Sequence, residues 1–491
     1  MPETMPNWLY KRASLTPNRT AIEFEQKRYT FLELHQEAET LARKLKAISE
    51  TPKTVACLLE NGPHTVALIH ALSYIGAVIV PLNTRLTASE IEYQLRDSNA
   101  GILVYDDVFR EKAVNASKNI DMQAISFEKL AQSEEADFEI RKEIDLNSQH
   151  TIMYTSGTTG FPKGVILTYG NHWWSAIGSS LNLGLYEHDK WLCCVPMFHM
   201  SGLSIVFRSV IYGIPIVIHK SFQPEKANEA ILHQGVTIAS VVSAMLSRML
   251  DALETNYPST FRCMLLGGGP APLPLLEACT KRNIPVYQTY GMTETASQIA
   301  TLSSEYMLKK IGSAGKPLFH SQLKIMKDGR EAHPNEIGEI VVKGPTVTKG
   351  YLGREKETKE AIKDGWLYTG DLGYLDDDGF LYVLDRRSDL IISGGENIYP
   401  AEIESVLLSH PDVVEAGVTG IDDETWGQVP IAFVVTKTKM SEQNLLQFCE
   451  QKLARYKLPK CIHFVKQLPR NSANKLLRRE LLKLLPERRE N

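Results

Sequence analysis

The segment Thr151-Ile-Met-Tyr-Thr-Ser-Gly-Thr-Thr-Gly-Phe-Pro-Lys-Gly164 joins a short apolar strand to a loop of glycines and hydroxyl side chains. Glycines let backbone N–H groups turn toward a phosphate chain, hydroxyls add donors, and a lysine adds charge. The loop is not of the GxxxxGK[ST] type, because Pro162 precedes the lysine and Gly164 follows it. It indicates phosphate binding, although a plain strand-to-helix turn has a similar composition. The candidate phosphate-binding residues are Thr155, Ser156, Gly157, Thr158, Thr159 and Lys163.

Around this loop the chain alternates β-branched runs with amphipathic helical patterns, which is typical of α/β layers. A helix is expected at 64–75 between strands at 54–60 and 76–82, and further strands are expected at 101–107, 215–220, 236–242, 263–268 and 285–291. After residue 311, short alternating strands rich in Gly and Asp predict a smaller β-rich subdomain. From residue 388 onward, helix and strand patterns predict a small α+β domain.

Composition places the chain among ordinary globular proteins. It has 491 residues, a formal net charge of -4, 43% hydrophobic and 23% charged residues, which argues against a disordered or fibrous chain. No apolar stretch near the N-terminus resembles a signal peptide. The longest uncharged run, 61–84, contains His64, His70 and Pro81, so it reads as a buried helix and strand, not as a membrane span. The cytoplasm is therefore the expected location.

Two further features of the composition bear on function. The seven cysteines are odd in number and form no CxxC pair, which favours reduced thiols over disulfides or a zinc site. Residues 451–491 hold twelve Lys and Arg against three Asp and Glu, a balance of +9. Such a segment suits nucleic acid, an anionic membrane surface, a polyanionic small molecule or simply a solvated helical face. Sparse aromatic residues there disfavour a single-stranded nucleic-acid platform.

Two more polar clusters follow apolar strands. In Gln288-Thr-Tyr-Gly-Met-Thr-Glu294-Thr295, Glu294 could hold Mg²⁺ against a nucleotide phosphate and Thr293 could donate to that phosphate. The alternative is a capping carboxylate in the first turn of a helix. Upstream, Gly267, Gly268 and Gly269 could let a planar base pack on the backbone, or could merely form a turn.

Three later segments complete the set. Asp371 suits paired ribose hydroxyls and Arg386 a ribose or phosphate, although either could be a turn or surface residue. Ser393-Gly-Gly-Glu-Asn-Ile-Tyr-Pro400 predicts a rigid loop before a helix that starts at the proline. The segment 468–479 presents Lys475 in a polar loop just before a basic helix.

These five segments, in this order, resemble the adenylate-forming family of acyl-CoA synthetases, luciferases and peptide-synthetase adenylation domains. The resemblance covers essentially the whole chain. It implies a large N-terminal domain (1–387) of layered α/β subdomains plus a small β-rich subdomain, and a small mobile α+β C-terminal domain (388–491). In that family ATP activates a carboxylate as an acyl-adenylate, and a thiol then displaces AMP.

The resemblance also assigns roles by position. Thr155 to Lys163 would form the phosphate loop, Asp371 and Arg386 would hold ribose, and Glu294 would hold Mg²⁺. Lys475 matches the catalytic lysine, preceded by Asn474 where glycine is usual, and Ser388 occupies the hinge position where aspartate or lysine is usual. The residues expected around adenine, substrate and phosphate are Gly267, Gly268, Gly269, Thr289, Tyr290, Gly291, Met292 and Thr293. Gly394, Gly395 and Glu396 would enter the site for the thioester step.

Within the family, residues 196–204 and 385–400 resemble the bacterial subfamily of o-succinylbenzoate–CoA ligases. This implies ATP, Mg²⁺ and CoA as reactants or cofactors, an aryl diacid as substrate, and His199 at the carboxylate entrance, unless His199 is a hydrogen-bonded core histidine. Ser201, Ser204, Arg208 and Ser243 are candidates to meet the second carboxylate, although Arg208 could be a surface cation.

Other functions stay open at this stage. A ligase for a fatty or aryl acid is the nearest alternative, and a luciferase-like oxygenase is a weaker one. A catalytically dead nucleotide-binding protein is disfavoured because Glu294, Asp371, Arg386 and Lys475 are all present. No nucleic-acid partner and no membrane insertion are expected, and the oligomeric state is open.

Overall fold

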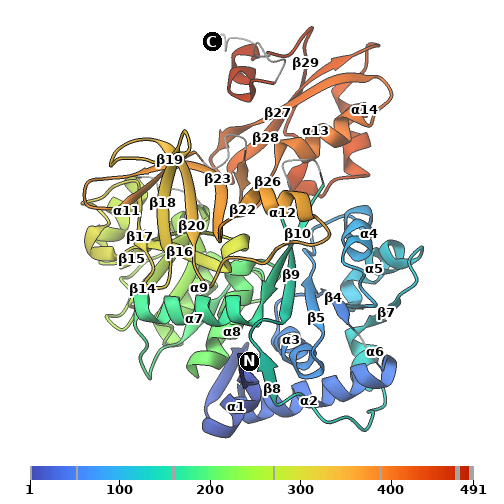
Figure 1. Cartoon of the computed structure of the whole chain (residues 1–491), viewed down its shortest axis with the longest axis vertical. Helices are drawn as coiled ribbons and strands as arrows, with labels where there is room; N and C mark the ends of the chain where they lie inside the picture. The colour runs from blue at the N-terminus through green and yellow to red at the C-terminus, as the bar shows by residue number, and fades with distance from the viewer. Residues whose placement is uncertain are drawn as a thin grey trace.

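The computed structural model describes residues 3–50, 53–155, 161–268, 271, 273–385, 390–469 and 476–485. The part up to Asp385, here called the N-terminal domain, contains two large β-sheets, and the part from Leu390, the C-terminal domain, covers one end of it (Figure 1). A large layered α/β domain followed by a small α+β domain is the expected architecture, which is confirmed. The expected boundary at residues 387 and 388 lies outside the described residues and stays a prediction.

The first sheet is sandwiched between two apolar layers. Alternate residues of its β4 strand are buried in different clusters: Val55 and Cys57 in one, Ala56 and Leu58 in the other. Helices therefore cover both faces, as expected for a mostly parallel sheet. In order, its strands are β21 (Gly350–Tyr351), β10 (Lys163–Thr168), β9 (Gln149–Thr155), β5 (Val78–Pro81), β4 (Thr54–Leu58), β6 (Ile102–Tyr105) and β7 (Gln123–Ser126).

The second sheet shares the central layer with the first. Trp191 and Cys193 of β11 point into the same cluster as Val55, while Leu192 and Cys194 point to the opposite face. Its parallel part contains β14 (Cys263–Gly267), β13 (Ile238–Val242), β11 (Trp191–Cys193), β12 (Ile216–Ile218) and β2 (Thr20–Phe24), with β15 (Val286–Met292) next to β14 and β3 (Lys27–Thr30) at the edge. The result is two sheets separated and flanked by helices.

The helices of the N-terminal domain follow the expected alternation with strands. In α2, Leu34, Ala38, Leu41 and Leu45 recur at helical spacing on the buried face. The helices are α1 (Trp8–Leu15), α2 (Phe31–Ile48), α3 (Pro63–Ile75), α4 (Ala88–Asp97), α5 (Arg110–Ser117), α6 (Phe127–Gln132), α7 (Tyr169–Leu183), α8 (Met200–Tyr212), α9 (Pro224–His233), α10 (Ser243–Asp251), α11 (Leu273–Lys281) and α12 (Glu355–Ala361).

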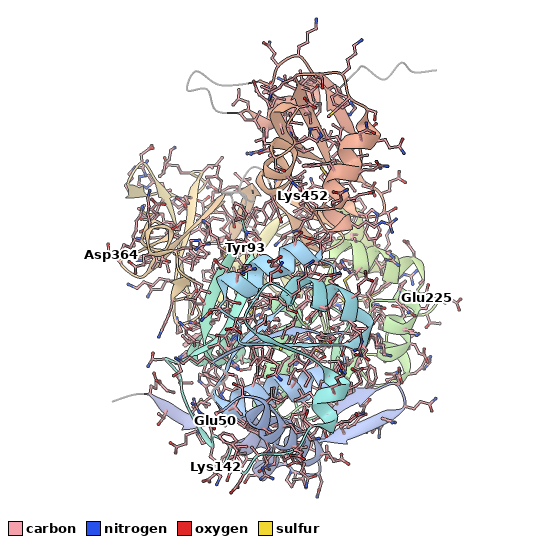
Figure 2. All side chains as sticks on the ribbon, turned by 90° about the vertical axis from the view of Figure 1, so that its right-hand side faces the viewer. Glu50, Tyr93, Lys142, Glu225, Asp364 and Lys452 are labelled. Atoms are coloured by element: carbon pink, nitrogen blue, oxygen red, sulfur yellow. The ribbon has the colours of Figure 1, made fainter. Side chains whose placement is uncertain are left out.

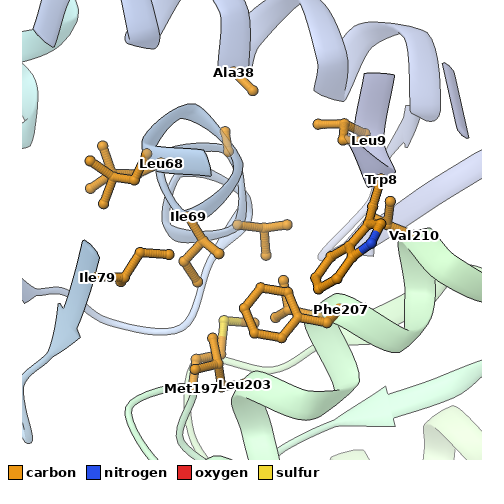
Figure 3. Close-up of a cluster of buried hydrophobic side chains, with 14 of the residues drawn as sticks. Trp8, Leu9, Ala38, Leu68, Ile69, Ile79, Met197, Leu203, Phe207 and Val210 are labelled. Atoms are coloured by element: carbon orange, nitrogen blue, oxygen red, sulfur yellow. The ribbon is translucent and has the colours of Figure 1, made fainter. Parts of the chain in front are cut away.

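The central layer contains an unusual group of aromatic and histidine side chains. Figure 3 shows α3 with Trp8 and Phe207 close to it. Next to Phe207, the ring of His150 stacks on Tyr169 with centroids 3.9 Å apart, and His172 lies 5.2 Å from His150. Burial lowers the pKa of both His70 and His172 to about 3 and lowers the pKa of His150 well below its ordinary value. These three imidazoles are therefore neutral in the folded protein.

The β-rich part expected after residue 311 extends the second sheet by antiparallel pairing through β16 and β17. Its strands lie together at one side of the molecule (Figure 1). They are β16 (Ser297–Leu302), β17 (Ser313–Pro317), β18 (Gln322–Lys327), β19 (Arg330–Glu331), β20 (Gly338–Lys343), β22 (Ile362–Lys363), β23 (Trp366–Leu375) and β24 (Leu381–Asp385). A separate pair, β1 (Thr4–Pro6) and β8 (Glu143–Asp145), joins the N-terminus to this domain.

The C-terminal domain has its own sheet and core. Its strands are β25 (Ile391–Ser393), β26 (Glu396–Ile398), β27 (Val413–Asp423), β28 (Gly427–Thr436) and β29 (Ile462–Phe464), covered by α13 (Pro400–Leu408) and α14 (Glu442–Glu450). Gly394 and Gly395 form the two-residue turn between β25 and β26. Their φ angles of 56° and 87° are both positive, so each of the two positions favours glycine. The basic helix expected after Lys475 is a 3₁₀ helix at Arg478–Leu484.

All seven cysteines are free thiols, and six of them are buried; Cys461 is the partly exposed one. Burial raises the pKa of Cys57 and Cys279 to about 12. Among the described residues, no helix is both long and apolar enough to cross a bilayer.

Candidate active site

A cavity lies where the two domains meet, at the carboxyl ends of β13, β14 and β15. These strands are parallel, so their ends share one edge of the sheet, which is where ligands bind in open α/β folds. The N-terminal half of α8 and the β25–β26 turn complete the lining. The predicted site residues in this lining are Thr155, His199, Ser201, Ser204, Arg208, Gly267, Gly268, Thr289, Gly291, Met292, Thr293, Glu294, Asp371 and Gly395.

His199 is a residue of the N-terminal domain that contacts the C-terminal domain at this cavity. It precedes α8, and its Nε2 lies 3.0 Å from Oε2 of Glu396 on β26. The other oxygen of Glu396 accepts from Arg85 at 2.8 Å, and Asn83 donates to Glu396 at 3.2 Å. Burial opposes the charge of Glu396, but His199 and Arg85 outweigh it and lower the pKa of Glu396. Glu396 is thus an ionised carboxylate that orients the imidazole of His199.

Arg208 is buried in the wall of the same cavity, with only 2% of its surface exposed. The guanidinium lies over the Trp191 ring at 5.3 Å and donates to Ser175 at 3.4 Å. Its Nε has no hydrogen-bond partner among the described residues, and none of their carboxylates forms an ion pair with it. Burial lowers the pKa of Arg208, although not enough to neutralise an arginine. The surface-cation alternative is therefore wrong, and a buried cation faces the cavity.

Glu294 and Asp371 are two buried carboxylates in the lining. Glu294 lies in the middle of a short 3₁₀ turn, Thr293–Thr295, and accepts from the Tyr351 hydroxyl at 3.0 Å. Asp371, in β23, accepts from the Tyr290 hydroxyl at 2.7 Å. Each tyrosine orients its carboxylate, so the cavity lining contains two oriented acceptors.

The donor set around Glu294 suits Mg²⁺ held in part by a phosphate. No cluster of three or more His, Cys, Asp or Glu side chains in the described chain could enclose a metal alone. Mg²⁺ is commonly held by one or two carboxylates plus substrate phosphates. Lys163, on the same side, lies 5.3 Å from the centre of the Tyr351 ring and so supplies a cation near Glu294.

Some predicted residues line a neighbouring cavity, and others lie outside the described chain. Ser243 and Tyr290 line a neighbouring cavity, which Val242, Gly268 and Gly395 border as well. The predicted residues outside the described chain are Ser156, Gly157, Thr158, Thr159, Gly269, Arg386, Ser388, Asn474 and Lys475. Their roles stay predictions.

Several residues that the structure brings to this site could not be identified from sequence patterns. Both amide atoms of Gln298 are buried in the lining and have no hydrogen-bond partner among the described residues. The neighbouring Ala296 and Ser297 adopt φ of 51° and 105°, a strained backbone that is typical of functional sites. Asn83 and Arg85 come from the loop before α4, more than 300 residues from Glu396. No local pattern marks such contacts.

The fold and this cavity define an enzyme that holds a nucleotide and an acid between two domains. The family model for AMP-binding enzymes matches residues 9–352, and the model for the AMP-binding enzyme C-terminal domain matches residues 402–475. The chain belongs to the AMP-binding enzyme family. A 2-succinylbenzoate–CoA ligase from Bacillus cytotoxicus is 56% identical over 488 residues, covering 99% of this chain and 100% of that protein.

Two solved structures of one relative differ in how well they match. A double variant of o-succinylbenzoate CoA synthetase from Bacillus subtilis, bound to a product analogue, has a TM-score of 0.95, with 49% identity over 98% of this chain and 99% of that chain. The same enzyme with ATP and magnesium ion has a TM-score of 0.78, with 49% identity over 98% and 100% of the chains. The present arrangement of domains therefore resembles that of the product-analogue complex.

Proposed function

We propose that this chain is an AMP-forming ligase that joins o-succinylbenzoate to CoA, in two steps at one site. A carboxylate oxygen of the acid attacks the α-phosphorus of ATP and pyrophosphate leaves. The CoA thiolate then attacks the carbonyl carbon of the acyl-adenylate and AMP leaves. Family membership and the similarity to 2-succinylbenzoate–CoA ligases support the reaction class. The same proposal places the reaction in the cytoplasm, where we expect ATP and CoA to be available.

The observation that supports the substrate is the buried guanidinium of Arg208 in the same cavity as His199. A buried cation without a carboxylate partner is costly, and an anionic ligand group would relieve that cost. o-Succinylbenzoate has two carboxylates, one to be activated and one retained on the ring. The retained carboxylate would meet Arg208 and Gln298, while the activated one would lie near His199.

The rest of the lining fits the ring of such an acid. Val195, Met200, Val241 and Leu265 provide apolar surface between the polar groups. A fatty acid would use this apolar surface as well, but it would leave the guanidinium of Arg208 unpaired. The polar wall of the cavity therefore favours the diacid over a fatty acid or a simple aryl acid.

The nucleotide side of the site uses the two oriented carboxylates. Asp371 would accept from the ribose hydroxyls, and Glu294, with Lys163 nearby, would meet the phosphates. Mg²⁺ at Glu294 would neutralise phosphate charge when bound. Lys475 is proposed to stabilise the charge that develops as the acyl-phosphate bond forms.

For the second step, the β25–β26 turn would guide the CoA thiol to the acyl-adenylate. Gly395 and Val242 border the same cavity, and Glu396 on the adjoining strand contacts His199 there. This arrangement would suit thioester formation, and adenylation would use a rotated orientation of the C-terminal domain.

The test is AMP release with CoA against a panel of acids. We expect kcat/KM for o-succinylbenzoate to exceed that for 4-phenyl-4-oxobutanoate, which lacks the ring carboxylate, by at least ~10²-fold. A medium-chain fatty acid should be poorer still. If either mono-acid equals the diacid, the substrate is wrong and only the ligase class is left.

A further inference from the structure

Beside the cavity, the two domains also meet where α4 packs against the segment Ala454–Lys457. Figure 2 shows α4, marked by Tyr93, directly below the C-terminal domain, in which Lys452 is labelled. Ala454 is 1% exposed and belongs to the apolar cluster of the N-terminal domain that contains Ile91 and Leu95 of α4. Tyr456 packs against both this cluster and the core of its own domain.

At the centre of this contact, Lys457 is a buried cation between two carboxylates. Its Nζ donates to Oε1 of Glu90 on α4 and to Oε1 of Glu402 on α13, both at 2.7 Å, and 3% of the residue is exposed. Burial alone would favour the neutral amine, but Glu402 and Glu90 raise the pKa of Lys457. The ammonium is therefore charged, and one of its two carboxylates comes from the other domain.

Glu90 uses its two oxygens for different purposes. Oε2 accepts from the backbone N–H and the hydroxyl of Thr87, at 2.8 and 2.7 Å, and so forms the capping box of α4. Oε1 is left to reach Lys457. The helix end thus holds the carboxylate in place before the C-terminal domain arrives, so little side-chain entropy is lost when the contact forms.

We propose that Glu90 is a positioning residue for the thioester step, because it clamps Lys457 and holds the C-terminal domain with the β25–β26 turn at the cavity. This inference rests on the proposed two-step ligase function. Rotation of the C-terminal domain would separate Lys457 from Glu90 but not from Glu402, which belongs to the same domain. The lysine would keep one partner in either orientation, and Glu90 would add stability to the thioester-forming orientation alone.

The test compares Glu90→Gln with Glu33→Gln. Glutamine is compatible with a capping box, so the Glu90→Gln variant should retain the N-terminal cap of α4. It should lose only the negative charge that pairs with Lys457. Glu33 forms the same capping box with Thr30 on α2, and its hydrogen bonds in the described chain are all to Thr30. The Glu33→Gln variant therefore measures the effect of changing a capping-box glutamate that makes no contact between the domains.

Two half-reactions are measured separately on the full-length enzyme. Acid-dependent exchange of pyrophosphate into ATP reports adenylation, and single-turnover transfer from supplied acyl-adenylate to CoA reports the thioester step. A charge-assisted hydrogen bond is about twice as strong as a neutral one. We expect Glu90→Gln to slow transfer to CoA roughly three- to tenfold, with exchange unchanged or slightly faster, because fewer molecules hold the competent orientation.

Two more variants, Lys457→Gln alone and Lys457→Gln combined with Glu90→Gln, test whether the two residues act as a pair. If they do, adding Glu90→Gln to Lys457→Gln should slow transfer no further. The proposal is overturned if Glu90→Gln and Glu33→Gln change the ratio of the two rates equally, or if exchange falls as much as transfer. Absence of o-succinylbenzoate-dependent exchange in the unmodified enzyme would instead refute the proposed function, so the two failures are distinguishable.

Discussion

The guanidinium of Arg208 is buried and has no carboxylate partner among the described residues. We predict that Arg208→Gln lowers kcat/KM for o-succinylbenzoate by at least ~10²-fold, because the ring carboxylate would enter the pocket without a cation. Activity with 4-phenyl-4-oxobutanoate should change far less. Steady-state kinetics with both acids measure the difference, and an equal loss with both would contradict the role.

Arg262 is the matched control for this variant. It too is partly buried, but its guanidinium pairs with Asp189 at 2.6 Å and holds the carbonyl of Gly184. Arg262→Gln would leave a buried carboxylate unpaired, so it should lower the melting temperature without changing the preference between acids. Arg208→Gln removes a charge that lacks a partner, so its melting temperature should fall less.

At the scale of elements, the β25–β26 hairpin forms part of the cavity lining. A Cβ at Gly395 would meet Val242 at 3.5 Å, which is ordinary contact, but its φ of 87° strains any L-residue. A leucine would extend beyond this Cβ into the cavity. We predict that Gly395→Leu reduces transfer from acyl-adenylate to CoA by at least tenfold, with pyrophosphate exchange nearly intact.

Gly365 provides the comparison for this backbone effect. It also has a positive φ, 77°, but it lies in the turn between β22 and β23, outside the cavity lining. Gly365→Leu should therefore cost stability without separating the two half-reactions. If Gly395→Leu behaves as this control does, the hairpin has no role in admitting the thiol.

The elements near the cavity were largely predictable, because their signals are local. The apolar runs at 236–242, 263–268 and 285–291 end in polar or glycine residues, and parallel strands bring those ends together. The burial of Arg208 was not predictable, since an arginine on an apolar helix is exposed or buried according to what packs on it. Helix type near the C-terminus was missed as well, because a basic pattern does not distinguish a 3₁₀ from an α-helix.

Contacts between domains were beyond the reach of the sequence. Glu90 and Lys457 are separated by 367 positions, and each lies in a pattern that already has a local explanation. Glu90 completes a capping box, and Lys457 belongs to a basic stretch. Nothing in either segment indicates the partner, which only the packing of α4 against the C-terminal domain reveals.

At the scale of the whole molecule, the three neutral histidines of the central layer contribute strongly to its response to acid. In the unfolded chain, His70, His150 and His172 have the ordinary pKa of 6.5 and bind protons below that pH. In the folded protein they do not, because burial lowers each pKa. The unfolded state therefore binds more protons, and stability must fall as pH falls. We predict that these three histidines together lower the free energy of unfolding by about 3 kcal/mol between pH 6.5 and 5.5.

Urea unfolding at pH 7.5, 6.5 and 5.5 measures this dependence. His150→Phe should keep the stacking on Tyr169 and remove one of the three titrating groups. Its loss over the same interval should be smaller than that of the unmodified protein by about 1 kcal/mol. An unchanged pH dependence in this variant would show that His150 takes up no proton on unfolding.

The burial of six of the seven cysteines has a practical consequence for labelling. A maleimide reacts with thiolate, and burial both hides the six sulfurs and keeps them protonated. The more accessible thiol is that of Cys461, the residue directly before β29. A ring nitrogen of His463 lies 3.3 Å from its sulfur. A fluorophore can therefore be attached to the smaller domain of the native chain without first removing the other thiols, and its signal would follow that domain through each catalytic cycle.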